Sequence, residues 1–255
     1  MNFDEIFINL SAIMWQKRNF RPIKRLNMRI KEKIKNNLSP EHQMSEAFVT
    51  SAILALSGGF MDAYTYNGRG GVFANAETGN IVLMGQRLME YDFHGAVKYF
   101  VSILAFALGI FAAENFRHIF RYAKKIHWRQ AMLIFEIVLL AFVGIIPESL
   151  NLVANVIVAF TAALQVQTFR KVAGYSFAST MCTGNLRSGM DALSVYLRER
   201  KPDQLRQAMH YFGIILFFTL GAGAGGVLTK YYGLHMIWLS CLLLLSVCLL
   251  MSAEE

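Results

Sequence analysis

Two copies of the tripeptide Thr-Gly-Asn lie about 105 residues apart, each in an apolar stretch that polar residues and glycines interrupt. A threonine at the start of a helix can cap the first turn, while the amides that follow stay free to bind a ligand. We therefore predict that each copy begins a half-helix and that the two amide ends converge on one polar locus. The alternative is that Thr-Gly-Asn only lets two helices pack closely. The candidate substrate-binding residues are Thr78, Gly79, Asn80, Thr183, Gly184 and Asn185.

Asp62 is the acidic residue with the clearest candidate role, because Gln167 occupies the same position relative to the second copy. A carboxylate in an apolar segment costs about 2.5–3.5 kcal/mol on insertion scales, so it usually faces a cavity or a partner. An acid opposite an amide makes a site with one titratable group, which suits proton or cation coupling. Asp62 and Gln167 are therefore further candidate binding residues. The alternative is that Asp62 is a structural partner of Arg69 or Arg87.

The two copies differ in their local charge. Glu77 precedes Thr78, where a helix N-terminus favours an ionised carboxylate and that carboxylate would repel a second anion. The second copy has no acid at the matching position, and Arg187 follows one turn later, so it is the better place for an anionic group. Glu136 is interpreted as structural.

Signatures of catalysis and of cofactor or metal binding are absent from the sequence. It contains no G-x-S-x-G elbow, no H-E-x-x-H motif and no phosphate-binding loop. Cys182, Cys241 and Cys248 form neither a C-x-x-C pair nor a cluster with zinc-site spacing. We therefore predict that the protein is not an enzyme and that it needs no cofactor or metal.

The elements that position these residues are predicted to be membrane-spanning helices. Charged residues make up only 16% of the chain and hydrophobic residues 55%, whereas about a quarter of the residues of a soluble domain are charged. Each of six apolar segments has about the 17–25 residues that cross a hydrocarbon core. The segments are Phe48–Tyr64, Ala96–Phe116, Gln130–Ile146, Leu150–Phe169, Ala208–Leu228 and His235–Met251.

The distribution of basic residues favours six spans over eight. Two weaker segments, Val72–Met89 and Ser176–Leu197, contain the Thr-Gly-Asn copies. If both enter and return on the same side, most of the 25 Lys and Arg residues face the cytoplasm, as the positive-inside rule requires. Only four then face outside, namely Arg69, Arg87, Lys98 and Lys230. If both crossed, the five basic residues between Arg117 and Arg129 would face outside instead.

The placement of the two copies predicts an internal duplication. Each copy follows one span and precedes two more, and Leu108-Gly109 and Leu220-Gly221 occur in the spans that follow. A repeat with an odd number of spans inserts upside down relative to its partner, which is an arrangement found in many secondary transporters. We predict two inverted three-span repeats at residues 45–147 and 148–255, each with a broken, re-entrant Thr-Gly-Asn segment.

Residues 1–44 form a basic arm ahead of the repeats. Nine Lys and Arg residues precede position 36, and apolar residues recur among them at three- and four-residue steps. This pattern predicts an amphipathic cytoplasmic helix that binds anionic lipid headgroups, with a charged tail as the alternative. The formal net charge of +8 is therefore attributed to cytoplasmic loops and lipid contact, and no nucleic-acid partner is predicted.

Several motifs resemble the YoaK family of bacterial integral membrane proteins, for which no activity is established. The resemblance rests on Gly59–Ala63, on Phe73–Asn80, and on a second Thr-Gly-Asn after Gln165-Val166-Gln167. It extends from about Glu46 to Met251, and the arm is longer than expected for the family. The resemblance implies a multi-pass protein of the bacterial inner membrane and supplies no substrate.

These observations together predict a transporter or channel for a small solute or ion, with proton coupling as an option. Both termini are predicted to be cytoplasmic, and a homo-oligomer is left open. The alternative is a scaffold or regulatory protein that does not transport and that uses its basic arm to bind lipid.

The predicted topology can be tested by labelling engineered cysteines in intact cells. Ser149→Cys should react with an impermeant thiol reagent added outside, because residue 149 lies in a predicted external loop. Lys124→Cys should be spared, because the loop between Arg117 and Arg129 is predicted to be cytoplasmic. Strong external labelling at position 124 would favour eight spans.

Overall fold

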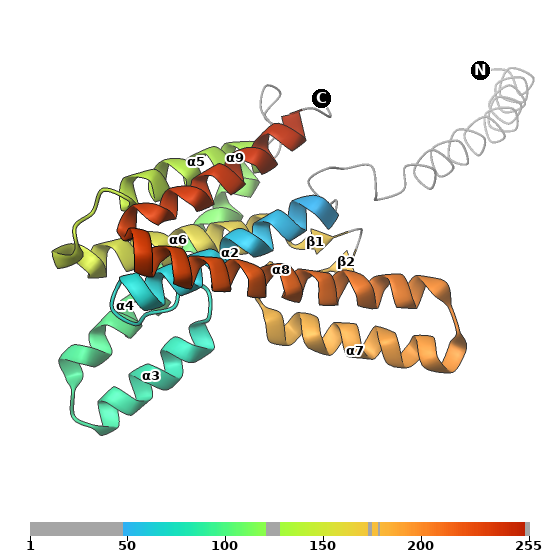
Figure 1. The fold of residues 1–255 in the computed structure, drawn as a ribbon, viewed down its shortest axis with the longest axis horizontal. Coiled ribbons are helices and arrows are strands. Elements are labelled where there is room, and N and C mark those ends of the chain that lie inside the picture. Colours follow the sequence, from blue (N-terminus) through green and yellow to red (C-terminus); the bar gives the residue numbers. More distant parts are fainter. Residues whose placement is uncertain (1–47, 121–127, 173–174, 178, 253–255) are drawn as a thin grey trace, which may run out of the picture. The chain divides into compact units, whose positions relative to one another are not determined.

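Helices account for most of the described residues in the computed structural model (Figure 1). The structure describes residues 48–252 except 121–127, 173–174 and 178, so the predicted basic arm lies outside the described residues. Between α6 and α7, β1 (Lys171–Val172) pairs antiparallel with β2 (Tyr175–Ser176), a short hairpin that the all-α prediction missed. The helices are α2 (Phe48–Gly68), α3 (Glu77–Met89), α4 (Phe93–Phe120), α5 (Trp128–Val143), η3 (Glu148–Leu150), α6 (Asn151–Thr168), α7 (Cys182–Glu199), α8 (Pro202–Tyr232), η4 (Leu234–Ile237) and α9 (Trp238–Ser252).

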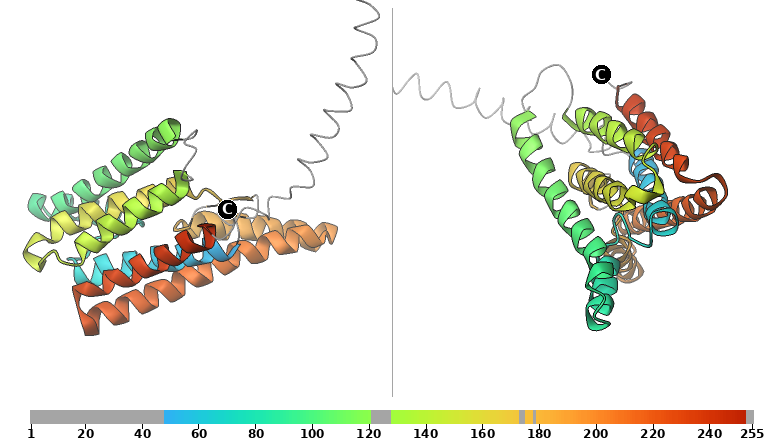
Figure 2. Two further views of the ribbon diagram at one scale, coloured as in Figure 1. Left: turned by 90° about the horizontal axis from the view of Figure 1, so that it is seen from above. Right: turned by 90° about the vertical axis from the view of Figure 1, so that its left-hand side faces the viewer.

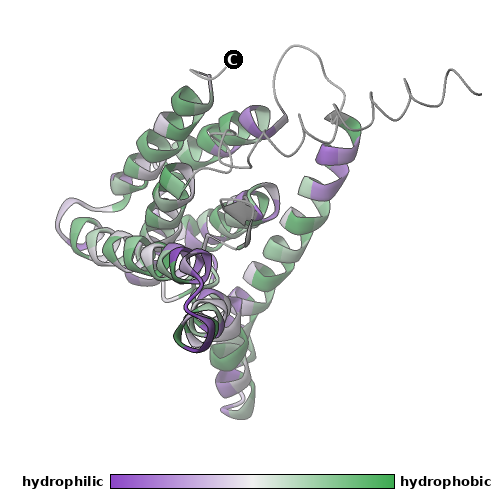
Figure 3. Ribbon diagram, turned by 90° about the vertical axis from the view of Figure 1, so that its right-hand side faces the viewer, coloured by the Kyte–Doolittle hydropathy of each residue, from purple (hydrophilic) through white to green (hydrophobic). Residues whose placement is uncertain are grey.

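Four of the described helical segments are long and apolar enough to cross a membrane, which indicates a membrane-embedded protein. They are Phe93–Ile119, Glu148–Thr168, Pro202–Tyr232 and Leu234–Ser252. Figure 3 shows apolar residues along most of the helices and hydrophilic residues mainly near their ends. The other two predicted spans coincide with α2 and α5 but fall outside this set. α2 carries buried polar residues, including Ser57 and Asp62, and α5 has only 16 residues.

α3 and α7 are amphipathic and differ from the apolar helices. α3 has 13 residues, which is about 20 Å at roughly 1.5 Å per residue, less than a hydrocarbon core of about 30 Å. α7 has 18 residues but ends in the charged sequence Leu197–Glu199. α3 packs on α4, and α7 packs on α8, so each forms an antiparallel hairpin with the helix that follows it (Figures 1 and 2).

The helix α2 is the most extensively buried of the described helices, and α8 runs against it at backbone distance. A Cβ atom on Gly59 would lie 2.0 Å from the carbonyl oxygen of Phe218, and one on Gly221 would lie 2.0 Å from that of Leu56. Small residues at such positions let two helix backbones approach closely. A similar contact joins α4 to α6, where Gly109 faces the backbone of Phe160.

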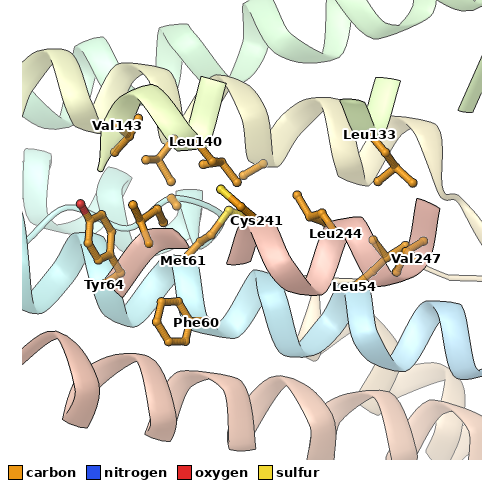
Figure 4. Packing of buried hydrophobic residues seen from close by; sticks show 14 of the residues in the cluster. Leu54, Phe60, Met61, Tyr64, Leu133, Leu140, Val143, Cys241, Leu244 and Val247 are labelled. Carbon is orange, nitrogen blue, oxygen red and sulfur yellow. The ribbon is translucent and has the colours of Figure 1, made fainter. Parts of the chain in front are cut away.

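The main apolar core lies between α2, α5, α6 and α9. Figure 4 shows side chains of α2, including Leu54 and Met61, facing Leu140 of α5 and Leu244 of α9. Each fully buried aliphatic side chain of this size contributes about 1.5–3 kcal/mol in water, but lipid is as apolar as the core, so here packing supplies the stability.

Arg69 closes one end of this core and is the largest fully buried side chain that the structure describes. Its Nε donates to the Tyr64 hydroxyl at 3.0 Å, and its Nη2 donates to the Val143 carbonyl at 2.9 Å. Its Nη1 donates to Asn151 Oδ1 at 3.1 Å and to the Pro147 carbonyl at 3.3 Å. The guanidinium therefore ties the end of α2 to the end of α5 and the start of α6.

The close contact of α2 with α8 predicts that alanine substitutions at two neighbouring glycines of α8 differ in their effect on stability. Gly221→Ala should lower the free energy of unfolding by about 2 kcal/mol or more, since the new methyl group meets backbone that cannot yield. Gly223→Ala should leave stability unchanged or raise it slightly, because nothing lies within 4 Å of that position. Thermal unfolding of the two purified variants in detergent measures the difference. Equal midpoints would refute the close contact.

Candidate functional site

The first interrupted segment joins α2 to α3 and is bound to α2 by Asp62. The chain leaves α2 through Gly70 and Gly71, which adopt φ values of 88° and 78° that favour glycine. The Asn75 amide then donates to Asp62 Oδ1 at 2.7 Å, and Asn75 Nδ2 donates to the Gly58 carbonyl at 3.1 Å. Asp62 thus accepts a hydrogen bond from a backbone amide between α2 and α3, where no helix supplies an acceptor.

Asn80 also binds the backbone of the first interrupted segment. The Phe73 amide donates to Asn80 Oδ1, and Asn80 Nδ2 donates to the Phe73 carbonyl, both at 2.9 Å. Asn80 Nδ2 also donates to Glu77 Oε2 at 3.0 Å. A Cβ atom on Gly79 would lie 2.9 Å from the Phe73 ring. Gly79 and Asn80 therefore hold the segment in place and do not line the cavity described below.

The predicted capping role of the two threonines is wrong. α3 begins at Glu77 after Ala76, and α7 begins at Cys182 after Met181, and neither capping residue has a side-chain hydrogen bond. Thr78 and Thr183 therefore lie inside the first turn. Backbone bonds close these turns, because the Asn80 amide donates to Ala76 and the Asn185 amide donates to Met181. The backbone angles of Ala76 (φ −82°, ψ 64°) and Met181 (φ −93°, ψ 74°) are similar, so the two segments enter their helices alike.

The second interrupted segment is the one that leads into α7 and carries the other Thr-Gly-Asn copy. Both interrupted segments open into one cavity of about 650 Å³. Of the predicted binding residues, the cavity brings together Asp62, Thr78, Thr183 and Gly184. It does not include Gln167, whose Nε2 donates to Glu114 Oε2 at 2.8 Å. The predicted pairing of Asp62 with Gln167 is therefore not formed.

Asn185 is likewise absent from the cavity lining and is buried at 3% exposure. The suggested alternative partners of Asp62 are also engaged elsewhere. Arg69 binds α5 and α6, and Arg87 pairs with Glu90 and Asp92.

Two polar lining residues that sequence reasoning missed are Asn75 and Thr180. Both are nearly buried, at 6% and 7% exposure, and each has an oxygen without a hydrogen-bond partner among the described residues. The repeat spacing could have found them, because Asn75 and Thr180 stand at the same distance before their Thr-Gly-Asn copies.

Four aromatic residues contribute to the apolar part of the cavity. Phe73 stacks on Tyr66, with ring centroids 4.5 Å apart and ring planes 18° from parallel. Phe106 of α4 and Phe218 of α8 also line the cavity. Each begins a Phe-x-Leu-Gly sequence whose glycine makes a close helix contact, so the two helices contribute matching positions.

Glu136 of α5 and Arg187 of α7 do not line the cavity. Glu136 is fully buried in α5, and neither of its oxygens has a hydrogen-bond partner among the described residues. Arg187, whose position suggested an anionic ligand, lies 4.0 Å from Asp191 and does not line the cavity.

A family model covering residues 50–250 matches the chain, and its description is a protein of unknown function, DUF1275. The chain belongs to the DUF1275 family. The match covers both interrupted segments and every described helix that lines the cavity. No curated protein matches the chain, and no solved structure matches it.

The role of Asp62 as a backbone acceptor predicts different outcomes for two substitutions. Asp62→Asn should fold, because its amide oxygen can still accept the Asn75 amide. Asp62→Leu leaves that buried amide unpaired, which should cost about 1–3 kcal/mol. Asp191→Leu, at an exposed acid of α7, is the control and should change the unfolding midpoint little. If Asp62→Leu unfolds at the parental temperature, the carboxyl group does not hold the segment.

Proposed function

We propose that this protein is a transporter or channel of the bacterial inner membrane that moves a small solute or ion through the cavity between α3 and α7. One observation carries the proposal. Two interrupted segments that are far apart in the sequence open into the same cavity, which contains polar groups from both. Irregular backbone at membrane depth is tolerated where it lines a cavity, and such breaks mark the binding sites of many transporters.

The pattern of helix contacts supports the proposed duplication. If α2 to α5 correspond to α6 to α9, the contact of α2 with α8 corresponds to that of α6 with α4. The contact of α3 with α4 corresponds to that of α7 with α8, and the contact of α5 with α6 corresponds to that of α9 with α2. A twofold-related pair of inverted three-span repeats has this pattern, and both interrupted segments then lie at the interface between the repeats.

The proposal includes six spans with both termini in the cytoplasm. In this proposal α2 and α5 are the two remaining spans beside the four apolar helices. Neither meets the length and hydropathy that identify a membrane span by itself. α2 is shielded from lipid by its neighbours, so it can carry polar residues at lower cost than a lipid-facing helix. The resemblance to the YoaK family supports the inner-membrane location.

The acidic residues that line the cavity are the groups that would carry protons in a proton-coupled transporter. Among the described residues these are Asp62 and Glu77. The two belong to the same proposed repeat, since Cys182 stands where Glu77 would be repeated. The two proposed repeats therefore contribute similar backbone to the cavity, but only the first contributes carboxyl groups.

Cys182 offers a direct test, because it is half-buried and lines the cavity. With Cys241 and Cys248 replaced by alanine, the protein is reconstituted into liposomes, and solute entry is followed by light scattering after an osmotic step. The solutes are potassium chloride, tetramethylammonium chloride, sodium gluconate, glycerol and alanine. At least one should enter faster than into empty liposomes, and N-ethylmaleimide should reduce that increment because its adduct narrows the cavity.

Replacing Cys182 by alanine as well provides the control, since this variant should transport and should resist N-ethylmaleimide. Entry no faster than into empty liposomes for all five solutes would refute the proposal. An increment that complete modification of Cys182 leaves unchanged would refute the assignment of the pathway to this cavity.

A further inference from the structure

The cavity between α3 and α7 has a one-sided set of charges. Two carboxyl groups line it, those of Asp62 and Glu77, and no Lys, Arg or His side chain among the described residues does so. The N-termini of α3 and α7 each add a partial positive charge of about half a unit. When both carboxyl groups are ionised, their charge exceeds that sum and the cavity is negative.

The unpartnered polar atoms in the cavity are chiefly hydrogen-bond acceptors. Asn75 Oδ1 and Glu77 Oε1 are buried, and neither has a hydrogen-bond partner among the described residues. An amide oxygen and an ionised carboxylate can only accept. Thr180 Oγ1, from the opposite interrupted segment, is also buried and without a described partner. Leaving such groups unpaired costs about 1–3 kcal/mol each, so a ligand toward which these side chains turn recovers that energy if it supplies N–H donors.

Aromatic residues from three parts of the chain line the remaining wall, together with Ala63, Met181 and Ala222. Tyr66 and Phe73 form a stacked pair, and Phe106 and Phe218 face the cavity from α4 and α8. Aromatic faces attract organic ammonium groups, whereas a bare divalent cation such as calcium needs about six to eight oxygen ligands. At about 650 Å³ the cavity is of the size that holds small organic ligands, for which the usual range is about 300–1,000 Å³.

We propose that this cavity binds an organic cation, namely a protonated amine with an apolar or aromatic body. The ammonium group lies among Glu77, Asn75 and Thr180, and the body packs against the aromatic wall. The proposal rests on the proposed function only in using the same cavity, and it names the chemical class of the solute.

The sign of the cavity's potential can be measured at Cys182 in the full-length protein that lacks the other two cysteines. Two methanethiosulfonate reagents are compared, one carrying a trimethylammonium group and one a sulfonate, with both rates divided by those for free 2-mercaptoethanol. The cationic reagent should react at least tenfold faster, because charged clefts raise the rates of opposite charges by about 10–10³-fold. Equal rates, or a preference for the sulfonate, would overturn the proposal.

Matched glutamate variants locate the source of this preference. Glu77→Gln should reduce the rate ratio several-fold, and Glu77→Asp, which keeps the charge, should retain it. Glu90→Gln is the control, because Glu90 follows the same helix, is exposed and does not line the cavity. If Glu77→Gln and Glu90→Gln give the same ratio as the parent, Glu77 does not set the charge of the cavity.

Ligand class is tested with three probes of nearly equal size: benzylammonium, benzyl alcohol and benzoate. Each is assayed for slowing the reaction of Cys182 with the neutral reagent methyl methanethiosulfonate. Benzylammonium should protect Cys182 at least tenfold more effectively than the other two, and Glu77→Gln should remove most of that difference. Protection by benzoate or benzyl alcohol equal to that by benzylammonium would overturn the proposal.

These assays measure the potential at Cys182 and the binding of probes, so they fail independently of the transport assay. A cavity that selects benzylammonium in liposomes that pass no solute refutes the proposed function and leaves the cation site standing. Transport that modification of Cys182 reduces in a protein that prefers the sulfonate reagent refutes the cation site and leaves the proposed function standing.

Discussion

The hydrogen bonds that satisfy the backbone between α2 and α3 are the constraint on which the rest of the structure depends. A chain that leaves a helix among apolar neighbours exposes amides that neither lipid nor the helix can satisfy. Asp62 accepts the Asn75 amide, and Asn80 pairs with both backbone groups of Phe73. These contacts decide where α3 begins, and so which residues line the cavity. A side-chain oxygen that accepts a hydrogen bond at position 62 is therefore a structural requirement, before the carboxyl group is a candidate for chemistry.

The second constraint is the close contact of α2 with α8. Gly59 and Gly221 bring the two backbones together, and Gly109 does the same for α4 and α6. Phe106 and Phe218 stand one turn before the glycines of α4 and α8, so the close contacts also set how these rings enter the cavity. The Phe-x-Leu-Gly sequence of α4 and α8 thus supplies both a close helix contact and a ring that lines the cavity. Substitutions that loosen the helix contact are expected to alter the cavity as well.

The cavity combines features that favour opposite charges. Two helix N-termini favour an anion, whereas Asp62 and Glu77 favour a cation. The buried oxygens of Asn75 and Thr180 add acceptors on the side of the cation. Because Glu77 has Cys182 as its counterpart, the charge is carried by one proposed repeat and the accessible thiol by the other. This division makes Cys182 a natural reporter of the potential that the acids create.

Composition and spacing by themselves determined the helical membrane class, the positions of the apolar helices and the two places where the apolar pattern is interrupted, because hydropathy and repetition are properties of the chain alone. The convergence of Thr78, Thr183 and Asp62 on one cavity was only a prediction until the packing was known. The threonine caps and the pairing of Asp62 with Gln167 were wrong, since backbone bonds close both first turns and Gln167 binds Glu114. The roles of Asn75, Asn80 and Arg69 depend on partners from distant segments or on the path of irregular backbone. Only the tertiary structure decides such partners, because a buried polar group takes whichever donor or acceptor the packing brings within reach.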